Sequence, residues 1–402
     1  MTETEPRRGA ARALRYAARA AHVEPAGPGH GGPGMIQFGS GDAYPESLPD
    51  MAEYAQMAAR RYRTETLQYA PRAGLPDLRE WIAGYLAGEG LRVAAESILV
   101  CNGAKQGIEL TCKLFLDPGD AIVVTRPTYQ SALGVFRGWE PEFLEVGMDA
   151  DGMLVDELAA TLAARARRDR PAPKLVYDVP EFHNPTGVTL SHARRAALVE
   201  LAARYGMLVA EDDPYRKIRF VGEAVPPIQA LDRDDCVVGL GTFAKLVAPG
   251  LRLGWVIAAP DIIGRMAAMK ADGGTCPFTQ RMLLEYCRAG RLEPDIDHRV
   301  RTYRAHRDVM AQAVREHLPQ ASFTVPDGGY YLWLRLPEGV DSDRLAALAE
   351  AQGVQVLPAS HFHATPGPRD HVRLAYSYAS PSEIVDGVRR LASAFARMET
   401  PG

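Results

Sequence analysis

Short apolar runs alternate with helical patterns through the middle of this 402-residue chain. Runs such as Ala121–Thr125 and Met207–Ala210 are almost wholly apolar, which is typical of strands buried on both faces. We expect seven such strands with helices between them, and therefore a mainly parallel sheet covered by helices on both sides. The predicted strands are Ser97–Cys101, Ala121–Thr125, Glu142–Val146, Lys174–Val179, Met207–Ala210, Asp235–Leu240 and Arg252–Ala258, with helices near 104–116, 128–137, 154–167, 191–205 and 260–271.

The pattern changes after about residue 275 and predicts a smaller α+β domain. Its expected elements are helices over 277–289 and 295–317, strands Ser322–Val325, Tyr331–Arg335, Val354–Leu357 and Val372–Ala375, and two further helices. Residues 6–22 have the Ala/Arg content of a basic amphipathic helix, and the Gly/Pro-rich stretch 25–34 indicates a flexible tether. We therefore divide the chain into an arm and tether (1–34), an entry segment of the small domain (35–60), a large domain (61–290) and a small C-terminal domain (291–402).

Composition narrows the classes of protein that are possible. A net charge of −4 and a pI near 6.2 give no electrostatic reason to bind nucleic acid or an acidic membrane surface. The five cysteines are scattered, odd in number and without a Cys-x-x-Cys pair, which favours free thiols in a reducing compartment. No apolar run approaches the roughly 18 residues of a membrane span, and no apolar block follows the N-terminal arginines as in a secretory signal. We expect a cytosolic protein.

One lysine has an unusual setting. The chain has only six lysines among its 46 Lys and Arg residues, and Lys245 lies among small residues in the segment that follows the buried run Cys236–Leu240. Removal from water there would lower the pKa of the Lys245 amine, which could then form a Schiff base with a carbonyl compound. The alternative is an ordinary exposed lysine in a loop.

Polar or glycine-rich groups follow most of the other predicted strands. Gly103-Ala104-Lys105 opens a helix and could offer backbone amides to a phosphate, although an ordinary strand-to-helix turn would look the same. Tyr129 could present an aromatic face, and Asn184 begins an Asn-Pro-Thr-Gly turn. Glu211-Asp212-Asp213 could hold a cation, but no histidine or second acidic cluster has ligand spacing, so no metal is predicted.

Taken together, these groups suit one ligand. They offer amides and an arginine for a phosphate, an aromatic face for a ring, an aspartate for a pyridinium nitrogen, a tyrosine for a ring oxygen and a lysine for an aldehyde. That ligand is pyridoxal 5′-phosphate, whose enzymes need a lysine Schiff base and an acidic partner for the ring nitrogen.

The chain resembles class I/II aminotransferases of the pyridoxal-phosphate fold type I superfamily, in the branch of aminoadipate, kynurenine and aromatic aminotransferases. The resemblance runs from about Gly34 to the last helix and implies a three-layer large domain plus a smaller α+β domain. Four motifs carry it: Asn184-Pro185-Thr186-Gly187, Asp212-x-x-Tyr215, Thr242-x-x-Lys245 with Arg252 seven residues on, and Val372-Arg373-Leu374-Ala375-Tyr376.

The resemblance also implies the role of each residue. Lys245 would form the Schiff base and move the substrate's proton, with Asp212 and Tyr215 as the other catalytic residues. Arg373 would bind the substrate α-carboxylate, assisted by Asn184 and the backbone near Gly41. The cofactor would be held by Gly103, Ala104, Lys105, Tyr129, Asn184, Asp212, Tyr215, Thr242, Lys245 and Arg252, and by Tyr69 of a neighbouring subunit, which implies a homodimer with shared sites.

The implied activity is the exchange of an amino group between an α-amino acid and a 2-oxo acid by a ping-pong mechanism. The segments 39–45, 103–105 and 358–363 depart from the usual family pattern. A lyase, a decarboxylase or a carbon–carbon bond-forming enzyme on an amino-acid substrate is therefore the alternative. A ligand-sensing regulator is a third hypothesis, but residues 1–34 are too short and too rich in Gly and Pro for a winged helix. Tyr44, His361 and His363 suggest a polar substrate tail, unless the histidines are ordinary loop residues.

Overall fold

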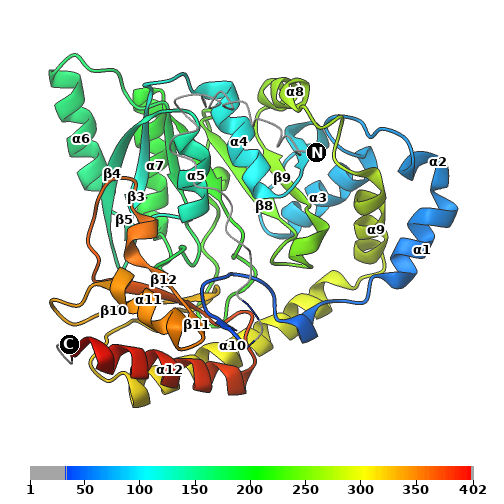
Figure 1. Cartoon of the computed structure of the whole chain (residues 1–402). Helices are drawn as coiled ribbons and strands as arrows, with labels where there is room; N and C mark the ends of the chain where they lie inside the picture. The colour runs from blue at the N-terminus through cyan, green and yellow to red at the C-terminus, as the bar shows by residue number, and fades with distance from the viewer. Residues whose placement is uncertain (1–31, 33, 400–402) are drawn as a thin grey trace, which may run out of the picture.

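The computed structural model describes residues 32 and 34–399, and helices alternate with strands along most of this part (Figure 1). The predicted basic helix over 6–22 and nearly all of the predicted tether lie outside the described residues. The first described elements are the short strand β1 (Ile36–Gln37) and the helices α1 (Ala52–Arg61), α2 (Arg63–Thr66) and α3 (Pro76–Gly88).

The main sheet has eight strands within the described residues, in the order β2-β9-β8-β7-β6-β3-β4-β5. Neighbours from β8 to β4 are parallel, β9 is antiparallel to β2 and β8, and β5 is antiparallel to β4. The predicted mainly parallel sheet is confirmed, with one more strand than expected because the two residues of β5 are too few to give a pattern. The strands are β2 (Ile98–Cys101), β3 (Ala121–Arg126), β4 (Glu142–Asp149), β5 (Gly152–Met153), β6 (Leu175–Asp178), β7 (Leu208–Asp212), β8 (Val237–Thr242) and β9 (Gly254–Ile257).

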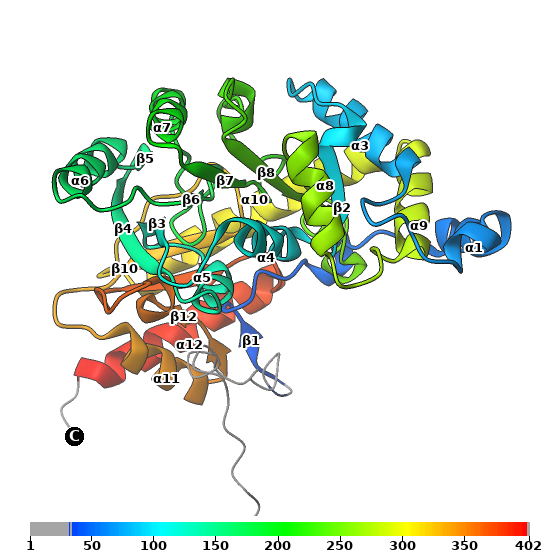
Figure 2. The same cartoon turned by 90° about the horizontal axis from the view of Figure 1, so that it is seen from above.

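Helices cover both faces of this sheet because alternate residues of each strand enter different cores. In β2, for example, Leu99 and Cys101 pack into one core, whereas Ile98 and Val100 pack into another. Figure 2 shows the resulting three layers. One face carries α4 (Ala104–Phe115), α5 (Gln130–Arg137) and α8 (Pro260–Met269), and the other carries α3, α6 (Val155–Arg167), α7 (His192–Tyr205) and α9 (Pro277–Arg288).

A smaller α+β part follows, as predicted, and lies below the main sheet in Figure 1. Its antiparallel sheet has the order β10-β13-β12, and β1 pairs in parallel with β11. The predicted domain boundaries remain predictions. No helix in the described part of the chain is long and apolar enough to cross a membrane. The elements are α10 (Leu292–His317), β10 (Tyr331–Arg335), α11 (Ser342–Ala351), β11 (Val354–Gln355), β12 (Leu357–Pro358), β13 (His371–Ala375) and α12 (Pro381–Glu399).

Two of the predicted strands in this part are wrong in detail. The single strand expected over 354–357 is two short strands, of which β11 pairs with β1 and β12 with β13. The strand expected over 322–325 is reduced to one bridge between Ser322 and Arg335. Phe323 and Val325 still pack against the core, and Pro326, which has no N–H, cannot extend a ladder.

The direction of the strands decides which residues meet. The parallel strands β7 and β8 end at Asp212 and Thr242 on the same edge of the sheet. Because β9 runs the opposite way, it begins on that edge, with Gly254 opposite Thr242. The residues that precede β9 are thereby brought beside the ends of β7 and β8.

Candidate functional site

A cavity of about 540 Å³ lies at this edge of the main sheet, between the sheet and the smaller part of the chain. The ends of β7 and β8 and the start of α4 form one side. Tyr331 of β10, Gln355 of β11 and Arg373 of β13 form the other side, and the segment 39–42 closes it. The cavity therefore exists only where the two parts of the chain pack together.

Lys245 reaches this cavity from the turn that follows β8. Its Nζ donates a hydrogen bond to the carbonyl oxygen of Gly41 at 2.5 Å and lies 5.0 Å from the centre of the Tyr330 ring. Burial lowers the pKa of the Lys245 amine, and the nearby Tyr331 and Asp42 oppose this effect in part. The surroundings therefore make the proton of Lys245 easier to lose than that of an exposed lysine, and the neutral amine is the nucleophilic form.

Asp212, the last residue of β7, places a carboxylate on the floor of the cavity. Its Oδ2 accepts a hydrogen bond from the Tyr177 hydroxyl at 2.7 Å, whereas its buried Oδ1 has no partner within the described residues. Burial raises the pKa of Asp212 to about 7, and the hydrogen bond from Tyr177 opposes this rise. A cationic N–H donor in the cavity would satisfy Oδ1 and restore the charge of the carboxylate.

The three consecutive acidic residues do not form a metal site. Glu211 accepts hydrogen bonds from two backbone N–H groups, and Asp213 pairs with Arg216, so both turn away from Asp212. Across residues 34–399, no group of three or more His, Cys, Asp or Glu side chains could hold a metal ion.

The N-terminus of α4 and Arg252 together form a candidate anion site. Gly103 precedes the helix with φ 80°, and a Cβ there would lie 2.9 Å from Arg252 Nη2. A Cβ on Gly254 would lie 2.9 Å from the Ala104 backbone nitrogen, so glycine is needed at both positions for this close approach. Lys105, an exposed residue, adds an amine, and both partial desolvation and Arg252 lower its pKa. Helix amides with two cationic side chains suit a phosphate.

The two remaining predicted ring contacts, Tyr129 and Tyr215, also line the cavity. Burial raises the pKa of Tyr129 to about 12 and that of Tyr215 well above its ordinary value of 10.0, so both phenols are neutral. The Tyr215 hydroxyl lies 3.1 Å from the Tyr331 hydroxyl. Thr242, at the end of β8, faces the cavity and accepts a hydrogen bond from the Ala244 backbone N–H.

Arg373 is the cation on the opposite wall. The side chain is buried, and Nη1 donates to Asn184 Oδ1 at 2.8 Å while Nη2 donates to the Gly39 carbonyl oxygen at 2.5 Å. The guanidinium group lies 4.1 Å from the centre of the Tyr331 ring. The hydrogen bonds of Arg373 in the described part of the chain go to an amide oxygen and a backbone carbonyl oxygen and not to a carboxylate, so its charge is available to an anionic ligand.

Comparison with known proteins agrees with this geometry. The family "Aminotransferase class I and II" matches residues 33–391. The chain belongs to this family. It is 34% identical to aromatic-amino-acid aminotransferase 1 of Thermococcus litoralis, over 89% of this chain and 87% of the relative. It is also 32% identical to 2-aminoadipate transaminase of Thermus thermophilus, over 90% of each chain. The kynurenine aminotransferase structure from Pyrococcus horikoshii matches with a TM-score of 0.87 and 34% identity, over 91% of this chain and 92% of that one.

The protein is therefore an aminotransferase that uses pyridoxal phosphate and acts on amino acids. The residues present fit this cofactor. The unpartnered Asp212 Oδ1 lies in the same cavity as the Lys245 amine and the anion site at the start of α4. A cofactor with a ring N–H, an aldehyde and a phosphate could bind to the Asp212 oxygen, the Lys245 amine and the anion site respectively.

Several residues of the aminotransferase site escaped the sequence analysis. Tyr331, Gln130 and Gln355 line the cavity, and Tyr177 bonds to Asp212. Tyr177 could have been found from its position near the end of a buried strand, β6, because the carboxyl ends of the parallel strands meet at the edge where Asp212 lies. Gln130, Tyr331 and Gln355 lie in predicted helices or strands but belong to no motif that indicates a functional role.

Some expected residues lie elsewhere. Tyr44, His361 and His363 do not line the cavity, so they give no support to a polar substrate tail. Tyr44 instead packs edge-on against His306, with ring centres 4.9 Å apart. Tyr69 is 91% exposed and lies outside the cavity of its own chain. Its predicted contact with a neighbouring subunit stays a prediction.

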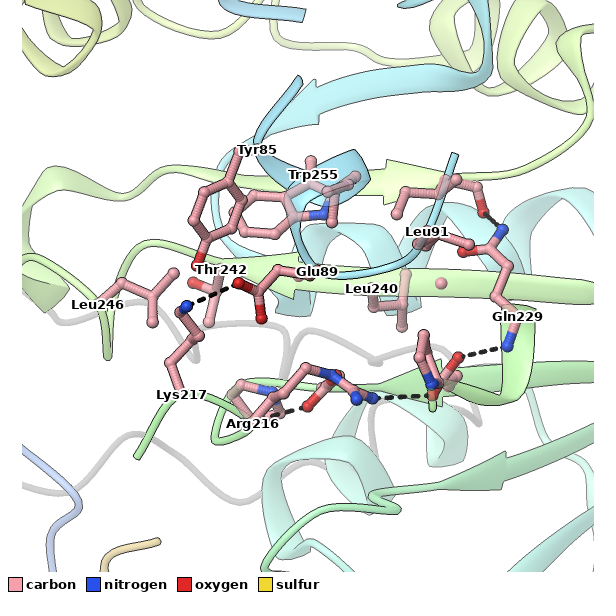
Figure 3. A pocket seen from close by; sticks show the side chains of 18 residues that line it. Tyr85, Glu89, Leu91, Arg216, Lys217, Gln229, Leu240, Thr242, Leu246 and Trp255 are labelled. Carbon is pink, nitrogen blue, oxygen red and sulfur yellow. Dashed lines mark hydrogen bonds and ion pairs between the residues drawn. The ribbon is translucent and has the colours of Figure 1, made fainter. Parts of the chain in front are cut away.

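A second cavity of about 70 Å³ shares Pro214 and Thr242 with the first (Figure 3). Tyr85 and Trp255 lie along one side of it, and Lys217 Nζ donates to Glu89 at 2.7 Å. Because this lysine is paired and the space is small, the larger cavity is the one suited to the aminotransferase chemistry.

Proposed function

We propose that the aminotransferase exchanges an amino group between an α-amino acid and a 2-oxo acid in two half-reactions, with Lys245 as its acid–base residue. The observation that carries this proposal is the arrangement of one cavity. It brings together a buried amine with a lowered pKa, an Asp212 oxygen without a partner in the described chain, and Arg373, a cation whose hydrogen bonds go to an amide and a backbone carbonyl.

The cofactor end of the cavity has a partner for each part of pyridoxal phosphate. When bound, the cofactor supplies an aldehyde and an electron-withdrawing ring. Asp212 Oδ1 would accept the ring N–H, and Tyr129 would stack on the ring. Tyr215 and Asn184 would donate to the ring oxygen; Asn184 Oδ1 accepts from Arg373, which leaves its Nδ2 for this purpose. The residues for the phosphate are Gly103, Ala104, Lys105, Thr242 and Arg252.

The substrate end orients the amino acid. Arg373 would bind the α-carboxylate through both terminal nitrogens, and Asn184 Oδ1 and the Gly39 carbonyl oxygen hold the guanidinium in place. Lys245 Nζ would then take the proton from the substrate Cα, because the neutral amine that burial favours is a base.

Polar side chains line the part of the cavity that is left for the substrate side chain, and they influence which amino acids can bind. Ser40, Asp42, Gln130 and Gln355 line the cavity, and Gln130 Oε1 is buried without a partner in the described residues. We propose that the substrate side chain donates a hydrogen bond there, which favours amino acids with a polar group over purely aliphatic ones.

The active unit that we propose is a homodimer in the cytosol. Tyr69 and Leu67 are 91% and 71% exposed, a degree of exposure that a partner subunit would remove. Tyr69 could then reach the phosphate of the partner's cofactor. All five cysteines are free, as expected for a reducing compartment.

The test is a single-turnover assay on the holoenzyme with a panel of amino donors, followed by absorbance and by mass spectrometry of the products. Transamination converts the bound cofactor to its pyridoxamine form and releases the matching 2-oxo acid. Lys245→Ala should abolish this conversion, whereas Lys217→Ala, which removes an amine from the neighbouring cavity, should retain it. Conversion in Lys245→Ala at the unmodified rate, or release of a decarboxylated or eliminated product instead, would refute the proposal.

A further inference from the structure

Tyr331 stands at the point where the cofactor end and the substrate end of the cavity meet. It is the first residue of β10, is 4% exposed and lines the cavity. Its hydroxyl lies 3.1 Å from the hydroxyl of Tyr215, and the two rings meet edge to face with centres 5.9 Å apart. This places a second phenol hydroxyl beside that of the tyrosine proposed to hold the cofactor's ring oxygen.

Two further contacts fix the position of this side chain. The Arg373 guanidinium lies 4.1 Å from the centre of the Tyr331 ring. A Cβ on Gly41 would lie only 2.1 Å from the Tyr331 oxygen, and the carbonyl of the same Gly41 accepts the hydrogen bond from Lys245. Tyr331 thus contacts the carboxylate-binding group with its ring, while its hydroxyl lies among Tyr215, Gly41 and Lys245.

We propose that Tyr331 is a positioning residue that donates a hydrogen bond to the Tyr215 hydroxyl and so strengthens Tyr215 as a donor to the cofactor's ring oxygen. This inference rests on the proposed function, which gives Tyr215 that oxygen. A hydroxyl that accepts one hydrogen bond becomes a stronger donor in the next, because the chain polarises cooperatively. The bond from Tyr331 also fixes the direction of the Tyr215 O–H toward the cavity.

The effect can be measured in the colour of the bound cofactor. When the cofactor is bound, its ring oxygen would be negatively charged and would attract the proton on the Lys245 nitrogen. A hydrogen bond donated to this oxygen would stabilise the negative charge and so weaken its hold on that proton. If Tyr215 donates a weaker hydrogen bond, the Lys245 nitrogen keeps its proton to a higher pH. The pH midpoint of the absorbance change then rises. One lost hydrogen bond corresponds to a rise of about 0.3 to 1 pH unit in Tyr331→Phe.

The experiment is a pH titration of the absorbance of the holoenzyme in five forms: the unmodified protein, Tyr331→Phe, Tyr215→Phe, the double variant, and Tyr330→Phe. Tyr330 is the matched control, because it neighbours Tyr331 in sequence and its ring lies beside Lys245, but it makes no hydrogen bond with Tyr215 in the described chain. We expect Tyr331→Phe to raise the midpoint, Tyr330→Phe to leave it unchanged, and the double variant to match Tyr215→Phe, since Tyr331 acts through Tyr215.

An unchanged midpoint in Tyr331→Phe, or an additive shift in the double variant, would overturn the inference. A Tyr215→Phe midpoint equal to that of the unmodified protein would instead overturn the role proposed for Tyr215, so the two failures are distinct.

Steady-state kinetics separate this role from a merely structural one. Tyr331→Phe keeps the ring against Arg373, so the KM for the amino acid should stay within about twofold while kcat falls by about two- to fivefold. Tyr331→Ala removes the ring as well and should raise KM. If Tyr331→Phe raised KM as much as Tyr331→Ala and lowered the Tm equally, Tyr331 would serve only to fill space and the inference would fail.

Discussion

Replacing the buried Asp212 by asparagine should stabilise the cofactor-free protein at alkaline pH. In the folded apoprotein, burial raises the pKa of Asp212 to about 7, against an ordinary value of 3.8. The folded state therefore binds one more proton than the unfolded state between these two values. Stability that is present below pH 3.8 is lost as the pH rises through about 7, because folding must then either take up a proton at Asp212 or bury its charge.

The size of the effect follows from the difference between the two pKa values. About three pH units correspond to about 4 kcal/mol. With an unfolding entropy of about 2.1 cal/mol/K per residue, a chain of this length would gain roughly 5 °C in Tm. Asp212→Asn does not titrate, so its advantage over the unmodified apoprotein should grow between about pH 4 and pH 7 and then level off.

The assay is thermal unfolding of both apoproteins from pH 4.5 to pH 8.5, repeated with saturating pyridoxal phosphate. The cofactor's ring N–H would pair with the ionised carboxylate, so its presence should erase or reverse the advantage of Asp212→Asn. Asp178→Asn is the matched control, because burial also raises the pKa of Asp178 to about 7 but this residue does not line the cavity. Its gain at alkaline pH should persist in the holoenzyme.

The slope against pH tests the reasoning, not the absolute Tm. A hydrogen bond gained or lost by the new amide would shift the Tm of Asp212→Asn equally at every pH. If the Tm difference from the unmodified apoprotein did not change with pH, Asp212 would be ionised in the folded protein without penalty. An advantage that survived saturation with the cofactor would contradict its pairing with the ring nitrogen.

Four other changes give distinct outcomes. Lys245→Ala should lower the rate of transamination by at least about 10²–10⁴-fold in single-turnover assays and leave the cofactor removable by gel filtration. Arg373→Gln should raise the KM for both substrates roughly 10–100-fold, since a charge-assisted hydrogen bond is worth about 1.5–3 kcal/mol; an unchanged KM would place the carboxylate elsewhere. Tyr69→Phe should weaken cofactor binding about 2- to 10-fold in a dimer verified by gel filtration, and no change would remove Tyr69 from the phosphate site. Gly41→Ala should lower stability by about 1–3 kcal/mol in denaturant unfolding because its Cβ would meet the Tyr331 oxygen, and Tyr331→Ala in the same chain should relieve the loss.

Much of the cofactor end of the site could be predicted from the sequence. Asp212 and Thr242 end neighbouring parallel strands, and Gly103 follows a third strand of the same sheet. A buried strand is a local pattern of apolar residues, and parallel strands place their carboxyl ends on one edge. The sequence therefore indicates which polar residues gather there before any contact is known. Arg252 was found through its spacing from Lys245, although its place depends on β9 running antiparallel to β8.

The substrate end depended more on packing between distant segments. Arg373 bonds to Asn184 across 189 residues of chain, and Tyr331 meets Tyr215 across 116. The motif around Arg373 suggested its role by resemblance, but Tyr331 had no such motif. Its hydroxyl gains a partner only because the small sheet packs over the edge of the main one. Likewise, the strand predicted over 322–325 failed because strand formation requires a neighbour to pair with, and Ser322 has one only at Arg335.

The sequence by itself thus determined the alternation of strands and helices in the large domain and the amine and acid at the strand ends, and it predicted an anion site at the start of a helix. Each of these depends on local periodicity and on the shared direction of parallel strands. Only the tertiary structure decided that Asp212 keeps one oxygen without a partner, that Arg373 is buried without a counter-ion in the described chain, and that Tyr331 contacts both ends of the cavity. These properties depend on which side chains are buried and on which side chains from the large and small parts of the chain meet. Neither can be read from a single segment of the sequence.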